Sequence, residues 1–204
     1  MSGVVRLGSQ LPVGIRRAIR RLPGFDRLRS WLVDRPRLPG PSPGELRAVV
    51  YLPTWVHWDV MRQRPQYLLS AFAAAGHPVY FVDHRERGVR QEEGVTICRS
   101  LRDVPRSGVI IYLHFAPLRH LIDNFDDAVV VYDVLDDLSI YDSEELGLPE
   151  GRKVRSHHPL VMERADVVLV SNHVLAERHR AERPDLIMVG NGVDPAAFGK
   201  TVQR

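Results

Sequence analysis

The sequence contains very little cysteine and no long apolar run. Cys98 is the only cysteine among 204 residues, which excludes an internal disulfide and every zinc site built from several cysteines. A single cysteine also suits a reducing compartment. No apolar stretch approaches the roughly 18–20 residues that span a bilayer, and residues 1–34 lack the apolar core of a secretory signal peptide. We therefore expect a cytoplasmic protein.

The motifs of several large enzyme classes are missing as well. The sequence has no G-x-G-x-x-G of dinucleotide-binding proteins and no G-x-x-x-x-G-K-[ST] phosphate loop. No G-x-S-x-G elbow follows a predicted strand to support a hydrolase nucleophile, and no H-E-x-x-H supports a zinc site. The side chains of His157 and His158 would point in different directions on a helix, so we interpret them as a surface or helix-start pair. We expect no metal and no other cofactor.

The net charge of +3 is distributed unevenly along the chain. Residues 1–44 hold nine arginines and two aspartates, a net charge of +7, whereas the remaining 160 residues hold 19 basic and 23 acidic residues, a net charge of −4. Apolar residues at three- and four-residue steps between the arginines predict a basic amphipathic helix, interrupted at Pro23-Gly24. This tail either lies on an anionic membrane surface or packs on its own domain. Nucleic-acid binding is the weakest option, because the tail has no groove-reading motif, and we expect no nucleic-acid partner.

Four prolines and two glycines within residues 36–44 predict a linker, so we place the start of the domain at about Glu45. From there, short and nearly continuous apolar runs alternate with helical patterns, as in parallel sheets covered on both faces. Six buried strands and a weaker seventh are predicted at Arg47–Leu52, Pro78–Asp83, Val109–His114, Ala128–Asp133, Asp166–Ser171 and Leu186–Val189, and at Val95–Cys98. Helices are predicted at Gln63–Ala75, Leu118–Asn124, Arg155–Arg164 and Val174–Glu182. This order predicts an α/β fold with a Rossmann-like, doubly wound and mostly parallel sheet of about six or seven strands.

Polar and aromatic residues follow the ends of the predicted strands. Open α/β sheets bind their ligands at the carboxyl ends of the strands, so these residues are expected to meet on one rim. Rings that stack on sugar faces and carboxylates that accept hydrogen bonds from hydroxyls are typical of a cleft that binds polyols. The rim residues selected as candidates are Trp55, His57, Trp58, Arg62, Arg64, His114, Asp133, Asp136, Asp137, Asn172 and Asn191.

Three stretches in order resemble the amino-terminal half of a GT-B glycosyltransferase of the family-4-like group, also called group 1. They are Trp55–Leu68 (WVHWDVMRQRPQYL) with the following Ala75–Val79, then Val131–Leu138 (VYDVLDDL), and then Glu163–Asp166 with Asn191–Asp194 (ERAD and NGVD). The resemblance implies that residues 45–195 form the acceptor-side domain and that residues 196–204 begin the crossover to a donor domain. We expect that donor domain to be absent from this chain. The glycine pair that many members carry after their first strand is missing here.

Three of the rim residues are assigned to catalysis, and the resemblance implies the role of the first, His114. A histidine at the position of His114 approaches the reacting sugar or the donor phosphate, although a histidine that ends an apolar strand is often a hydrogen-bonded core residue. Asp133 and Asp136 would bind acceptor hydroxyls or act as a base, or else cap the helices that follow.

The other rim residues are assigned to substrate binding. Arg62 and Arg64 would hold a phosphate or a carboxylated sugar, or else pair with Asp59 or the acidic rim. Trp55 and Trp58 would form a stacking platform for the acceptor, or else pack beneath the rim. Asn191-Gly192 is interpreted as a turn that permits positive φ. His57, Asp137 and Asn172 complete the set.

The resemblance implies transfer of a sugar from a nucleotide-sugar to a cell-surface glycan or lipid-linked acceptor. The basic tail would hold such an enzyme on the inner face of the membrane. The main alternative is a truncated, noncatalytic binding or interaction module that needs a donor domain on a separate chain. A sugar-nucleotide-modifying enzyme of another Rossmann-like class is the third hypothesis, and the missing glycine fingerprint argues against it.

Overall fold

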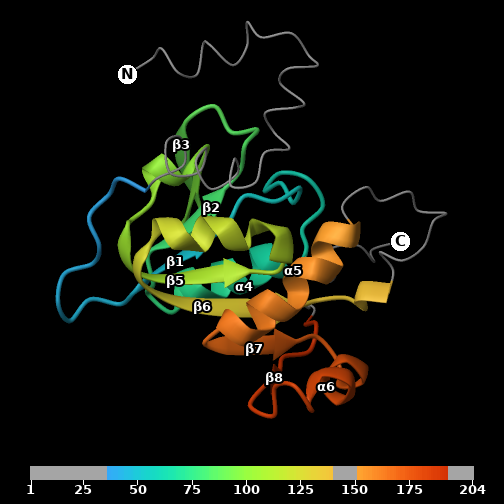
Figure 1. Ribbon diagram of the computed structural model, residues 1–204. Coiled ribbons are helices and arrows are strands. Elements are labelled where there is room, and N and C mark those ends of the chain that lie inside the picture. Colours follow the sequence, from blue (N-terminus) through green and yellow to red (C-terminus); the bar gives the residue numbers. More distant parts are fainter. Residues whose placement is uncertain (1–35, 140–150, 193–204) are drawn as a thin grey trace, which may run out of the picture.

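A mostly parallel sheet of eight strands is the centre of the computed structural model, which describes residues 36–139 and 151–192 (Figure 1). The strands are β1 (Ala48–Tyr51), β2 (Val79–Val82), β3 (Val89–Glu92), β4 (Val95–Cys98), β5 (Ser107–Leu113), β6 (Asp126–Val134), β7 (Val167–Val170) and β8 (Ile187–Met188). The predicted amphipathic helix of the tail and the predicted start of the crossover lie outside the described residues.

The strand order is β3-β4-β2-β1-β5-β6-β7-β8, and only β3 runs antiparallel to its neighbour. If the parallel strands alone are numbered along the chain, the order begins 3-2-1-4-5-6, which is compatible with a Rossmann-like fold. The α/β prediction is confirmed, and the sheet has one strand more than the upper prediction. The order reverses between β1 and β5, where sheets of this kind open a crevice for ligands.

Helices cover both faces of this sheet (Figure 1). Helix α4 (Arg64–Ala74) buries Leu69 on one face, in a cluster with Tyr51, Phe81 and Tyr112. The opposite face is covered by two 3-10 helices, η1 (Leu101–Asp103) and η2 (Ala116–Asn124), and by the helices α5 (Gly151–Arg164) and α6 (His173–His179). None of the helices in the described residues is long and apolar enough to cross a membrane.

Helix α4 ends as its sequence predicts. Gly76 has a φ of +91°, and its N–H donates to the carbonyl of Ala73 (3.0 Å). The N–H of His77 donates to the carbonyl of Phe72 (3.1 Å), which completes a Schellman motif. Glycine adopts this left-handed conformation without steric cost, so the chain turns directly towards β2.

Strand β3 was not predicted, because it is an edge strand with a polar sequence. Its residues Val-Arg-Gln-Glu are mostly exposed and bury no apolar face in the core. A tight turn joins β3 to β4, and both Glu93 (φ 51°) and Gly94 (φ 77°) have positive φ there. The Glu93-Gly94 pair was therefore the feature of the sequence that could have predicted this hairpin.

The opposite edge strand was predicted to be buried, and that prediction is wrong. Both residues of β8 are exposed, with Ile187 at 51% and Met188 at 56% of their full accessibility. Within the sheet β8 pairs only with β7, so it forms the edge.

Residues 36–44 lie against the domain instead of linking to it. The N–H of Leu38 donates to the carbonyl of Val104 (3.2 Å), and the carbonyl of Leu38 accepts from the N–H of Arg106 (3.0 Å). The predicted domain start at Glu45 is therefore too late. This segment also contains a Gly-Pro-Ser-Pro-Gly sequence, but its serine precedes β1, whereas a nucleophile elbow follows a strand.

Candidate functional site

A pocket of about 550 Å³ opens at the carboxyl edge of the sheet. It lies between the start of α4, the chain after β6 and the loop after β8. Its lining includes four of the predicted rim residues and several that were not predicted: Arg62, Gln63, Arg64, Tyr67, Leu68, Leu135, Asp136, Gly190, Asn191 and Gly192. Four of the residues predicted to meet on one rim therefore line one pocket at the carboxyl edge of the sheet.

A buried ion pair joins the start of α4 to the end of β6. Arg64 donates from Nε to Asp133 Oδ2 (2.8 Å) and from Nη2 to Asp133 Oδ1 (3.2 Å). The side chain of Asp133 has no exposed surface and that of Arg64 is 10% exposed. Such a two-point contact fixes the plane of the guanidinium as well as its position.

Three further hydrogen bonds complete this arrangement. The hydroxyl of Tyr112 on β5 donates to Asp133 Oδ2. Nη1 of Arg64 donates to the carbonyl of Gly190 (3.1 Å) and to Asn191 Oδ1 (3.2 Å), so one guanidinium holds the loop after β8. Burial lowers the pKa of Arg64, but the hydrogen bonds and charge of Asp133 outweigh it and raise the pKa above its usual value. Arg64 therefore stays charged.

The loop at Asn191-Gly192 is shaped by Arg64 and not by its backbone conformation. Neither residue has a positive φ, so the prediction of a positive-φ turn is wrong. Asn191 instead contributes its side-chain oxygen to Arg64 and lines the pocket.

Arg62 lines the pocket with its charge already balanced by a glutamate. It donates from Nη1 to Glu93 Oε1 (2.6 Å), contacts the second Glu93 oxygen through Nη2, and donates to Ser70 Oγ (2.8 Å). Its Cζ lies 4.8 Å from the ring centroid of Tyr67. The predicted alternative partner, Asp59, pairs with Arg90 instead. The hydrogen bonds from Arg62 and Ser70 lower the pKa of Glu93 to about 2.

The two aspartates after β6 have different environments. Asp136 is exposed, lines the pocket and makes no ion pair within residues 36–139 and 151–192. Asp137 pairs with Arg178 on α6 and accepts a hydrogen bond from the N–H of Ser139 (2.9 Å). The Ser139 and Arg178 contacts lower the pKa of Asp137 to about 2. Asp136 is thus the carboxylate that a ligand in the pocket can reach.

Aromatic side chains gather at the switch point between β1 and β5. His114 Nδ1 lies 3.1 Å from the hydroxyl of Tyr51, and the two rings stack with centroids 5.5 Å apart. Burial lowers the pKa of His114 to about 4, so its imidazole is neutral at pH 7. Trp55 is half exposed and rests edge-on against Phe115, with centroids 4.3 Å apart. Its free face is available for stacking on a ligand.

Trp58 and His57 lie beneath this rim. Trp58 is 6% exposed and packs on Phe81 at a centroid distance of 5.3 Å, so of the two tryptophans only Trp55 offers an open ring face. His57 Nδ1 contacts Asp83 Oδ1 (2.9 Å), and Asp83 Oδ2 also accepts from the N–H of Trp58 (3.2 Å). These contacts tie the loop after β1 to the end of β2, which is a positioning role.

Asn172 lies at the start of α6 and serves as its N-cap. Its Oδ1 accepts from the N–H of Leu175 (3.0 Å), and its amide donates to Ser171 Oγ (3.1 Å). An asparagine cap is a common way to satisfy a helix start. Asn172 is not among the residues that line the pocket.

Several residues that shape the site were missed. Tyr51 and Tyr112 lie inside apolar strands and were read as core, and Glu93 lies in the unpredicted hairpin. The interpretation of His157-His158 as a surface or helix-start pair is wrong for His158, which is 8% exposed in the middle of α5. Nothing in the local sequence distinguishes these residues, because their partners come from other elements.

Comparisons with known proteins assign no family: no protein-family model and no curated protein matches the chain.

The two buried histidines predict how stability depends on pH. Burial lowers the pKa of both His114 and His158 to about 4, whereas an unfolded histidine titrates near 6.5. The unfolded chain therefore binds more protons between these values, so stability is lost as the pH falls from about 6.5 towards 4. We expect the free energy of unfolding in urea to fall between pH 7.5 and pH 5.0 by on the order of 1–2 kcal/mol for each histidine.

The exposed His173 provides the matched control for this pH dependence. His173→Gln should leave it unchanged, whereas His114→Asn should weaken it. Equal stability of the unmodified protein at pH 7.5 and pH 5.0 would show that these imidazoles are not held neutral.

Proposed function

We propose that this chain is the acceptor-side domain of a GT-B sugar transferase, which moves a sugar from a nucleotide-sugar to a cell-surface glycan or lipid-linked acceptor. The observation that carries the proposal is the pocket at the carboxyl edge, where Asp136 is the one carboxylate among the described lining residues. The resemblance in the sequence supplies the reaction class. A cytoplasmic location and a peripheral position on the membrane through residues 1–44 belong to the same proposal.

The balance of charge in the pocket favours a neutral, hydroxyl-rich ligand. Glu93 matches the charge of Arg62, and Asp133 matches the charge of Arg64. Asp136 then leaves the lining with one uncompensated negative charge among the described residues. A phosphate would have to displace a carboxylate from a guanidinium, whereas a sugar hydroxyl donates directly to Asp136.

Each group has a distinct part in the proposed reaction. Asp136 accepts the hydrogen bond of the acceptor hydroxyl and removes its proton as that oxygen attacks the donor sugar. Arg64 and Asp133 are positioning residues that hold the wall of the pocket. Trp55 and His114 do not line the pocket. At the switch point, Trp55 stacks on a further sugar ring of the acceptor, with neutral His114 packed against it. Stabilisation of the leaving diphosphate is assigned to the donor domain of the proposed transferase.

Binding of glycans by the chain alone tests the acceptor role directly. We expect an array of cell-envelope oligosaccharides to contain at least one ligand, and Trp55→Ala to weaken that binding about tenfold, as expected for loss of one aromatic contact. Trp55→Phe should retain most of the affinity. Binding that is insensitive to both changes would remove Trp55 from the site. Glycan binding without any transferase activity would favour the noncatalytic module.

A further inference from the structure

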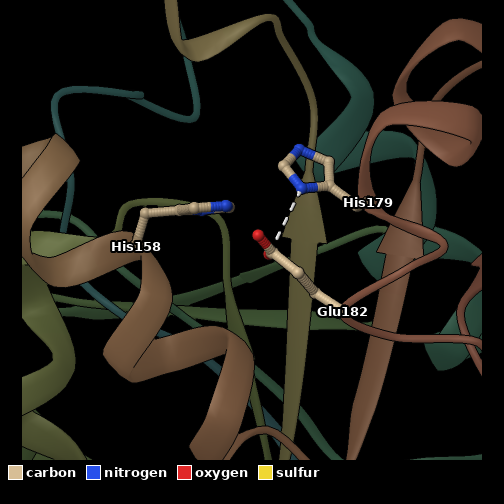
Figure 2. Close-up of side chains that lie close together, drawn as sticks. All are labelled: His158, His179 and Glu182. Carbon is tan, nitrogen blue, oxygen red and sulfur yellow. Dashed lines mark ion pairs between the residues drawn. The ribbon is translucent and has the colours of Figure 1, made fainter.

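Three metal-ligating side chains meet between α5 and the turn after α6 (Figure 2). His158 lies in the middle of α5, His179 is the last residue of α6, and Glu182 follows three positions later. One donor atom of each lies within 4.8 Å of the others, and His179 Nδ1 is 3.9 Å from Glu182 Oε2. Figure 2 shows the ring of His158 directed towards the other two side chains.

The ring of His158 has one nitrogen bonded and one nitrogen without a partner. His158 Nδ1 is 2.8 Å from the hydroxyl of Tyr132 on β6. His158 Nε2 is buried and has no hydrogen-bond partner, although the residue is only 8% exposed. Buried polar atoms in native proteins are almost always satisfied, so an orphan nitrogen on a ring that faces His179 and Glu182 indicates a missing partner.

This arrangement matches the surroundings of a histidine that binds metal. Such a histidine typically bonds an oxygen through its second ring nitrogen, which fixes the ring and its tautomer. Metals bind the neutral imidazole. Burial and the neighbouring His179 lower the pKa of His158 to about 4, so its ring is neutral at pH 7.

We propose that His158, His179 and Glu182 bind one divalent transition-metal ion, zinc in the first place, which fastens the turn after α6 to α5. Two imidazoles and a carboxylate suit zinc, whereas magnesium and calcium prefer oxygen ligands alone. In a tetrahedral zinc site the ligand atoms lie about 3.3 Å apart, so the three groups must draw together by roughly 1 Å. The Glu182 side chain is 65% exposed and can rotate to do so. Water completes the fourth position.

The turn is already held beside α5 by protein contacts. Arg183 donates to the carbonyls of Met162 and Ala165, the latter at 2.9 Å. The ion would therefore strengthen an existing contact between two helices.

The metal site and the pocket are separated by the sheet. Tyr132, which contacts His158, and Asp133, which contacts Arg64, are consecutive in β6 and so point to opposite faces. The proposed ion therefore lies on the other face of the sheet from the pocket and takes no part in the proposed sugar transfer.

Zinc binding by the full chain, purified without a histidine tag, tests this site. We expect equilibrium dialysis to find one tight zinc ion per chain. We expect zinc at about 100 times its Kd to raise the Tm by roughly 5–10 °C. Cobalt in place of zinc should give the visible absorption of a four-coordinate ion.

Variants separate the site from adventitious histidine binding. His179→Gln should weaken zinc binding by about 100-fold or more, since loss of a residue that only orients a metal ligand already costs 10–100-fold. Glu182→Gln changes an exposed side chain, so it should fold normally and still lose about tenfold. His173→Gln on the same helix should bind like the unmodified protein. Normal zinc affinity in Glu182→Gln and His179→Gln, or no bound zinc at all, would overturn the proposal.

Discussion

Replacing Arg64 by alanine is expected to destabilise the folded chain by about 3–5 kcal/mol, because the change leaves an ionised carboxylate buried without its partner. Asp133 has no exposed surface, and Arg64 supplies two of its hydrogen bonds. Tyr112 alone cannot offset a full negative charge in that position. Arg64→Ala also releases the loop at Gly190 and Asn191, so the pocket wall is lost together with the stability.

Arg62 is the matched control, two positions earlier in the chain. Its partner Glu93 is 43% exposed and Arg62 itself is 35% exposed, so water screens the pair. Exposed ion pairs contribute about 0–1 kcal/mol, and Arg62→Ala should cost no more than that. Urea denaturation at pH 7.5 measures both variants. The double variant Arg64→Ala with Asp133→Asn should recover part of the loss, because the buried charge is gone. Equal destabilisation by the two arginine changes would contradict the assigned roles.

Replacing Asp136 by asparagine is expected to lower sugar transfer by about 10²- to 10⁴-fold, the usual contribution of a general base. Asparagine retains the size of the side chain but does not accept a proton. Because Asp136 is exposed and makes no ion pair with the described residues, its replacement should leave the free energy of unfolding within about 0.5 kcal/mol of the unmodified protein.

The control for Asp136 is another exposed aspartate far from the pocket. Asp123 lies in η2 and pairs with Arg164 at the end of α5. Both residues lie just before the starts of strands β6 and β7, whereas the pocket lies at the carboxyl ends of the strands. Asp123→Asn should transfer sugar like the unmodified protein. Measurement of kcat/KM for sugar transfer by both variants tests the role of Asp136. Full activity in Asp136→Asn would assign the proton to another group and remove the catalytic part of the site.

The strands were predictable because their burial is a local property of the sequence. Runs such as VIIYLH and AVVVYD are apolar on both faces, which suits strands at the centre of a covered parallel sheet. Strand β3 was not predicted for the opposite reason, since an exposed edge strand has no apolar pattern to recognise. The same limit explains β8, whose apolar residues were read as buried and lie exposed at the other edge.

The candidate site was predictable by location but not by pairing. Strand ends can be located along the chain, so Arg64, Asp133 and Asn191 were expected on one rim. Their mutual contacts could not be predicted, because Arg64 and Asp133 are 69 positions apart and meet only through the packing of α4 on the sheet. The surroundings of His158 were equally hidden, since Tyr132 and His179 contact its ring from a strand and from another helix.

The most direct test of the proposed function is transfer itself. The chain is incubated with a panel of nucleotide-sugars and a membrane extract as acceptor source, with and without a polypeptide that supplies a GT-B donor domain. We expect release of nucleoside diphosphate and incorporation of labelled sugar for one donor when both parts are present, and loss of both signals in Asp136→Asn. Background release with every donor in both arrangements would contradict the assignment of this chain to sugar transfer.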